Sequence, residues 1–319
     1  MPRLGLFALA ATTGALLHTA ALAQSDYPNR VVRVVNPYVA GSTTDILARA
    51  LSAGMSSRLG QQFIVENRAG AGGALGTAGV ARADADGYTL LYAPALVLTV
   101  HPQDRTDTGY KPDALVPICQ GFVNAMALAV RMDSPLKNIA DLVAAAKQKP
   151  GALNYGHQGV VTIPHLAMEE FLIAAAIDIK DIPFRGEPLV MTDLLGGRID
   201  VASIVLGTAA GQNVRVIGIF SETRHPAFAD VPTVKEQGYD VSPISFGGLL
   251  APAGTPAPVL AKLSQACDGA AKDEAYKSVA LRAAQPPDYY DDAKGFRARL
   301  DRDTAAKARV LARIKSKPQ

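Results

Sequence analysis

A stretch of small and hydroxyl-bearing residues, NPYVAGSTTDILAR, stands between an apolar segment and a helix pattern at residues 36–49. The apolar segment, residues 31–35, is typical of a buried strand. The first N–H groups of a helix have no partner inside it, and the helix dipole is positive there. Such a loop can therefore hold a carboxylate or phosphate without lysine or arginine. The alternative is an ordinary capped helix start, with Asp45 or a threonine as the cap.

A second loop has the same placement later in the chain. It follows a short strand pattern, LNYG, runs from Gly156 to Thr162, and enters a helix near Pro164. Proline is expected in a first helical turn, so free N–H groups end this loop too. His165 can orient the loop, although a histidine at a helix start is more often structural. On local sequence alone a plain helix start is the favoured interpretation of the first loop, and the presence of two such loops makes an anion clamp more plausible.

One cation stands in a third turn, PFRGEP. Arg185 can pair with a ligand carboxylate, pair with Glu187, or stay solvated, and the sequence leaves all three open.

Catalysis is less favoured than binding. Ser42 and His157 can face each other, with Asp45 near Ser42, but nothing marks a nucleophile elbow or an oriented base. The segment AGAGG, residues 69–73, lacks the Lys-Ser/Thr pair of a phosphate loop, and Leu75 breaks the dinucleotide spacing. We therefore expect no enzyme, and a tight turn at AGAGG.

Charge and motif content exclude further classes. The net charge is +3 with acids and bases mixed, and no basic run points to nucleic acid. The five histidines are scattered, and no CxxC or HExxH spacing occurs. We expect no metal and no cofactor.

Strand and helix patterns alternate along the chain, which predicts an α/β fold with parallel strands. Two such units followed by a helical tail suggest a bilobed receptor that closes on a ligand. Strands are expected at residues 31–35, 62–67, 88–93, 126–131, 153–156, 181–184, 199–205 and 214–220, and helices at 44–59, 139–147, 164–176, 189–195, 257–271, 274–283 and 293–314.

The first 23 residues are typical of a secretory signal peptide. Arg3 precedes an uncharged, apolar run that ends in Ala21-Leu22-Ala23, so we expect cleavage after Ala23. The alternative is an N-terminal anchor, because the run is near the lower limit for spanning a membrane. We therefore predict a periplasmic protein.

Two cysteines, Cys119 and Cys267, follow. An oxidising compartment permits a disulfide between them. Because cysteine is often simply a core residue, we favour two separate buried thiols.

The chain resembles the Bug receptors, the TctC-type solute-binding proteins of tripartite tricarboxylate transporters. The matching segments include YPNRVVRVVNPYVAGSTTDILAR, LGQQFIVENRAGAGGALGTAGVARADADGYTLLYA, MTDLLGGRIDV, RHPAFADVPTVKEQGY and GLLAPAGTPAPVLAKL. The resemblance implies a bilobed type II periplasmic-binding-protein fold, with two mixed sheets flanked by helices and a cleft between the lobes. It also implies a carboxylate ligand held between two loops.

Mapped onto this sequence, the resemblance assigns ligand contacts to the loops Tyr38–Asp45 and His157–Thr162, and we add candidates from three further segments, Arg185 among them. These contacts are Tyr38, Ala40, Gly41, Ser42, Thr43, Thr44, Asp45, Ala95, His157, Gln158, Gly159, Val161, Thr162, Arg185 and Ser203.

The departures from the family pattern bear on the ligand. The second glycine of the usual P-F-x-x-G-G-x-x-D is Ser42, and Pro94-Ala95 replaces small hydroxyl residues. The usual S-G-x-G-T reads QGVVT at residues 158–162, and a polar F-D-N segment is replaced from Ser203 onward. We therefore predict a carboxylate with an apolar or aromatic body, held at one end by the first loop, because a second buried carboxylate without partners is unfavourable. The alternative is an orphan receptor whose ligand is unchanged, lost or not a carboxylate.

We expect residues 1–23 to be the signal peptide, residues 24–122 plus 245–319 to form lobe one, and residues 123–244 to form lobe two. The expected partners are the carboxylate and the membrane subunits of a tripartite tricarboxylate transporter, with the receptor a monomer. A periplasmic sensor that feeds a two-component system is the alternative.

Overall fold

The computed structural model describes residues 27–104, 108–241, 244–286 and 289–315. The predicted signal peptide, residues 1–23, lies outside them. Within the described part, none of the helices has the length and apolar character needed to cross a membrane. The elements in chain order are β1 (Val32–Asn36), α2 (Thr43–Leu59), β2 (Phe63–Asn67), η1 (Ala71–Gly73), α3 (Ala74–Ala81), β3 (Thr89–Pro94), α4 (Leu96–Thr99), α5 (His101–Asp104), η2 (Pro112–Ala114), β4 (Leu115–Arg131), α6 (Ile139–Gln148), β5 (Asn154–His157), α7 (Ile163–Ala175), β6 (Lys180–Pro183), α8 (Glu187–Leu195), β7 (Val201–Val205), α9 (Leu206–Ala209), β8 (Val214–Phe220), η3 (Pro226–Phe228), β9 (Ile244–Pro252), α10 (Ala257–Lys272), α11 (Glu274–Arg282), β10 (Asp291–Asp292) and α12 (Ala293–Lys315).

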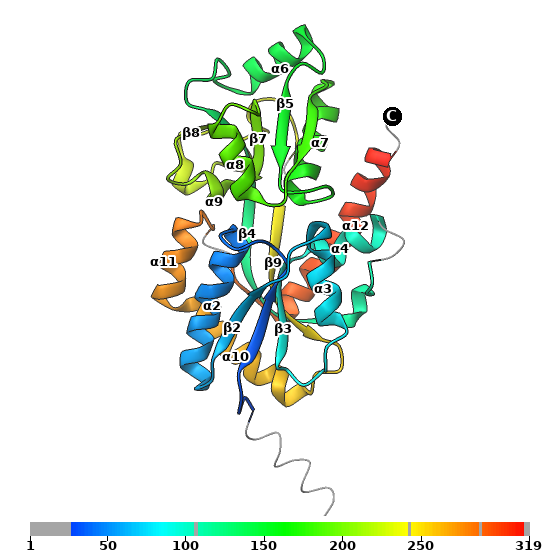
Figure 1. Ribbon diagram of the computed structural model, residues 1–319, viewed down its shortest axis with the longest axis vertical. Coiled ribbons are helices and arrows are strands. Elements are labelled where there is room, and N and C mark those ends of the chain that lie inside the picture. Colours follow the sequence, from blue (N-terminus) through cyan, green and yellow to red (C-terminus); the bar gives the residue numbers. More distant parts are fainter. Residues whose placement is uncertain (1–26, 105–107, 242–243, 287–288, 316–319) are drawn as a thin grey trace, which may run out of the picture.

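Two mixed sheets form the two lobes. In the first, β1 pairs in parallel with β2 and β3, whereas β9 runs antiparallel to β3 and β4. In the second, β5 pairs in parallel with β6 and β7, and β4 runs antiparallel to β7 and β8. Helices flank both sheets (Figure 1). The predicted mixed α/β class is confirmed.

The long strand β4 belongs to both sheets. It pairs with β9 as far as Ala125, which faces Ile244, and from Met126 onward it pairs with β7 and β8. Figure 1 shows β4 and β9 running side by side between the upper and lower lobes. The predicted lobe limits at 122/123 and 244/245 stay a prediction; β4 changes sheets between residues 125 and 126.

Local sequence explains how the first loop is positioned. Val32, Val34 and Val35 of β1 are at most 1% exposed, so the strand is fixed by burial. Ser42 caps the start of α2, and Gly60 ends that helix in the left-handed conformation that glycine favours. The loop between β1 and α2 is therefore held at both ends.

A disulfide joins Cys119 in β4 to Cys267 in α10, with 6.5 Å between the Cα atoms. Our expectation of two separate thiols is wrong. Helix α10 packs on β4 within the core of the first lobe, and this packing brings together two residues 148 positions apart. Sequence spacing alone carries no sign of that approach.

Candidate functional site

A cavity of about 570 Å³ lies between the lobes. Four chain segments border it, and each follows the C-terminal end of a strand, where open α/β sheets bind ligands. Two segments follow β1 and β2, and the other two follow β5 and β6. The lining residues are Pro37, Tyr38, Val39, Ala69, Gly70, Ala71, Gly72, Gly73, Gln158, Gly159, Val160, Phe184, Arg185 and Gly186.

Most of this lining is apolar side chain or backbone, and it contains one charged group. Arg185 is exposed in the cavity wall and makes no hydrogen bond or ion pair with the described residues. Glu187 is buried instead, where it accepts from the N–H of Val205 at 2.9 Å and the hydroxyl of Thr208 at 2.6 Å. The alternative in which Arg185 pairs with Glu187 therefore does not occur.

The first loop is held by a carboxylate of its own. The Ser42 hydroxyl accepts from the N–H of Asp45 at 3.3 Å, as a helix cap does. In turn, the Asp45 carboxylate accepts from the N–H of Gly41 at 3.0 Å, and also from Arg49 and Asn67. Burial alone would raise the pKa of Asp45, but these hydrogen bonds outweigh it and hold the pKa below its ordinary value.

The residues predicted in the first loop lie in different places. Tyr38 lines the cavity, and its hydroxyl donates to the carbonyl of Gly72 at 3.2 Å. Gly41 and Thr43 line a second cleft of about 570 Å³, bordered by α2, α8, α9 and α11. The remaining four line neither space: Ala40, Ser42, Thr44 and Asp45.

The second loop contributes Gln158 and Gly159 to the cavity wall. Val161 adopts a φ of +59°, the left-handed region that a β-branched residue rarely enters. The loop is braced by two hydrogen bonds: the N–H of Val161 donates to Nδ1 of His165 at 3.1 Å, and the Thr162 hydroxyl donates to the carbonyl of Gly159 at 2.7 Å. Backbone strain kept in place by such bonds is common at ligand sites.

Three further predicted residues do not line the cavity. The N–H of buried Ala95 donates to the carbonyl of Phe246 at 2.7 Å, and the Ser203 hydroxyl donates to the carbonyl of Pro164 at 2.6 Å. His157 is fully buried and faces Asp181. The Asp45 carboxylate is bound within lobe one and His157 faces Asp181 instead, so the structure does not assemble Ser42, Asp45 and His157 into a catalytic group.

Sequence reasoning missed part of the wall. We predicted residues 69–73 as a tight turn, which they form, with Gly72 at a φ of +65°. Their position directly after β2, on the same sheet edge as the β1 loop, was the available signal. Phe184 and Gly186 were also missed, although they flank Arg185.

Residues 47–315 match the family of tripartite tricarboxylate transporter receptors, TctC. The chain belongs to this family. It is 34% identical over 270 residues to a UPF0065 protein of Bordetella pertussis, covering 83% of this chain and 84% of that one. The family consists of solute-binding receptors and not of enzymes, so the expectation of a non-enzymatic Bug or TctC-type protein is confirmed.

Solved structures agree over most of the chain. The periplasmic binding protein BugD matches with a TM-score of 0.86 and 29% identity, covering 92% of this chain and all of that one. Rpa4515 of R. palustris, solved with adipate, matches at 0.85 and 25%, covering 91% and 98%. MatC from Rhodopseudomonas palustris, solved with malate, matches at 0.83 and 26%, covering 89% and 100%.

Proposed function

We propose that this TctC receptor binds a small carboxylate with an apolar or aromatic body and delivers it to a tripartite tricarboxylate transporter. The observation that carries the proposal is the cavity between the lobes. It is large enough for a small metabolite, both lobes contribute to its wall, and Arg185 is its one charged side chain. An arginine fork matches a carboxylate in shape and charge.

The same wall argues against a polyanion. One carboxylate can meet Arg185, but the rest of the wall offers apolar groups, the Tyr38 and Gln158 side chains and backbone. A second carboxylate far from Arg185 would lose its hydration without gaining a charged partner, which is unfavourable by several kcal/mol. The adipate in Rpa4515 has a methylene body, whereas the malate in MatC is short and hydroxylated. Both of these ligands are dicarboxylates. Our proposal differs from both cases, because the apolar part of the wall is left to a ligand body without a second charge.

Calorimetric titration of the wild type and an Arg185→Gln variant tests the proposal. Candidate ligands are adipate, aliphatic and aromatic monoacids, malate and citrate, preselected by their effect on melting temperature. We expect the monoacids to bind more tightly than the dicarboxylates adipate and malate, and Arg185→Gln to weaken monoacid binding roughly 10- to 100-fold, the range for one charge-assisted hydrogen bond. Lys180→Gln is the matched control, because Lys180 is an exposed cation of β6 that does not line the cavity.

Tight binding of citrate or malate would contradict the apolar-body assignment and leave the receptor assignment standing. An equal loss of ligand affinity in Arg185→Gln and Lys180→Gln would indicate a general effect of protein charge and would contradict a direct contact between Arg185 and the ligand. Unchanged ligand affinity in Arg185→Gln would mean that Arg185 does not bind the ligand carboxylate, and that the carboxylate lies in another part of the cleft.

We further propose that the protein acts as a monomer in the periplasm after cleavage behind Ala23. The apolar run at residues 4–23 and the family's periplasmic members support this location. The fifteen ligand contacts predicted from the sequence stay a prediction. The cavity favours Tyr38, Gln158, Gly159 and Arg185 among them.

A further inference from the structure

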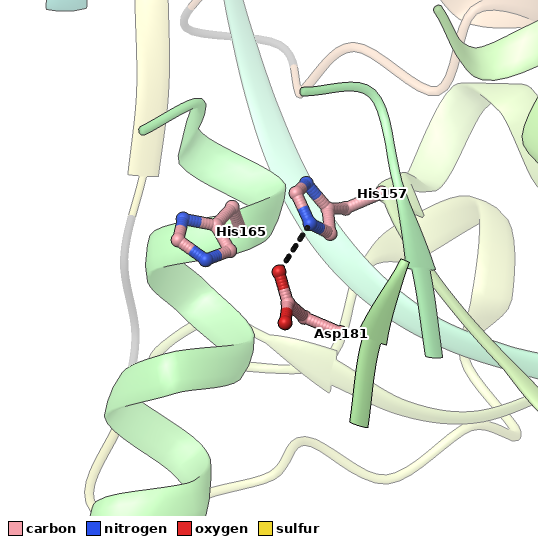
Figure 2. Close-up of side chains that lie close together, drawn as sticks. All are labelled: His157, His165 and Asp181. Carbon is pink, nitrogen blue, oxygen red and sulfur yellow. Dashed lines mark ion pairs between the residues drawn. The ribbon is translucent and has the colours of Figure 1, made fainter. Parts of the chain in front are cut away.

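Three side chains of lobe two converge outside the ligand cavity. His157 comes from the end of β5, His165 from the first turn of α7, and Asp181 from β6 (Figure 2). One nitrogen or oxygen atom of each lies within 4.8 Å of the others. None of the three lines the cavity.

His157 is the side chain that calls for an explanation. Its ring is completely buried, and its Nε2 atom has no hydrogen-bond partner among the described residues. Unsatisfied polar atoms in a protein interior are rare and unfavourable. Figure 2 shows that this nitrogen points toward the Asp181 carboxylate, and the distance to Oδ2 is 3.6 Å.

The hydrogen bonds of His157 assign its proton. Nδ1 lies 2.9 Å from the carbonyl oxygen of Gly159 and 3.3 Å from the N–H of the same residue, and the shorter contact is the one that a proton on Nδ1 would make. With the proton on Nδ1, Nε2 presents a lone pair toward the Asp181 carboxylate.

We propose that His157, His165 and Asp181 bind a divalent transition-metal ion of the zinc class. Two imidazole nitrogens and one carboxylate oxygen are a donor set that zinc and its neighbours accept and that calcium and magnesium do not favour. A cation between Nε2 and the carboxylate would satisfy both lone pairs. The carbonyl of Gly159 already orients His157 as metal-binding histidines are usually oriented.

The distances require a small rearrangement. Ligand atoms in a tetrahedral zinc site lie about 3.3 Å apart. The 3.6 Å between His157 and Asp181 is close to that value, and the Asp181 side chain is 50% exposed and can move. His165 can bind the ion in one of two ways. Its Nδ1 atom can do so after giving up the hydrogen bond from the N–H of Val161, or its Nε2 atom can do so after losing its proton. We therefore expect micromolar affinity, well short of a structural zinc finger.

Zinc titration of the exported protein, with any affinity tag removed and after treatment with a chelator, tests the site. We expect one ion per chain by calorimetry, and visible absorption bands when cobalt replaces zinc. Asp181→Asn and His165→Gln should each weaken zinc binding at least tenfold. Asp178→Asn is the matched control, because Asp178 is exposed just before β6 and is not part of the cluster.

Several outcomes would overturn the proposal. They are absence of zinc binding, zinc binding that both variants retain, and calcium or magnesium binding as tight as zinc binding. Circular dichroism and melting in chelator show whether the variants fold. If a variant does not fold, nuclear magnetic resonance of the wild type tests the proposal instead. Zinc must then shift the imidazole nitrogen resonances of His157 and His165 and leave those of His225 unchanged.

Discussion

Asp45 shows at the scale of one residue how the first loop keeps its shape. Its carboxylate is 3% exposed and binds Gly41, Arg49 and Asn67. A carboxylate of the chain, and not of a ligand, therefore accepts the N–H of Gly41 in this loop. We infer that the first loop acts as a rigid wall, and that the ligand charge is met by Arg185.

Replacing Asp45 with asparagine should lower the free energy of unfolding by about 1–3 kcal/mol at pH 7, because a charge-assisted network is lost. The folded pKa of Asp45 lies below its unfolded value, so this stabilisation is complete above the unfolded pKa, about 3.9, and is lost as pH falls through the folded pKa. Urea denaturation of both proteins from pH 7 to pH 3 measures the difference. Asp301→Asn, at an exposed aspartate of α12, is the control. A difference that does not shrink toward pH 3 would contradict this account.

At the scale of elements, the disulfide between β4 and α10 ties that helix to the sheet of lobe one. A cross-link over 148 residues restricts the unfolded chain strongly, and we expect the double variant Cys119→Ala, Cys267→Ala to lose about 2–5 kcal/mol of unfolding free energy. Urea titration measures this, with the reduced wild type for comparison. Equal stability of the variant and the oxidised wild type would mean that the cross-link is absent in solution.

The helices were predictable because their ends carry local signals. Helix α2 was expected at residues 44–59 and spans Thr43–Leu59, between the Ser42 cap and Gly60. The first half of β4 was not predicted, and the reason is physical. Its pairing with β9 shifts register between Pro117 and Cys119 and again between Gln120 and Phe122, so no regular alternation marks it.

The candidate site was only partly predictable for a related reason. The sequence identifies loops that follow strands, but which loops meet depends on how the two lobes approach. Residues 69–73 and Arg185 share one cavity, although more than a hundred positions separate them. Val161 is a second case, since it takes a place where the family pattern has glycine and still adopts a φ of +59°.

At the scale of the whole molecule, the lobes touch through small residues. The hydroxyls of Thr43 and Thr208 lie 3.3 Å apart, and Thr208 donates to buried Glu187. Next to this contact, a Cβ atom added to Gly207 would lie 2.2 Å from the carbonyl oxygen of Ala283. No side chain fits there unless the lobes move apart.

Gly207→Ala should therefore hold the lobes apart and weaken ligand binding about tenfold or more, without altering the wall of the cavity. Calorimetry gives the affinity, and small-angle scattering of the ligand-saturated protein should show a larger radius of gyration. Gly79→Ala is the control, since its added Cβ would meet only an ordinary contact with Arg68. Unchanged affinity and radius would show that this contact does not limit closure.

The charge in the cavity wall belongs to one lobe alone. Arg185 stands on lobe two, whereas lobe one lines the space with Pro37, Tyr38, Val39 and residues 69–73, none of them charged. If the ligand is an anion, the order of events follows from this asymmetry. Capture begins on lobe two, at a rate that falls as salt screens Arg185. The residence time is then set by how long the uncharged lobe one stays closed over the ligand. Lobe two therefore controls the association rate constant, and lobe one controls the dissociation rate constant.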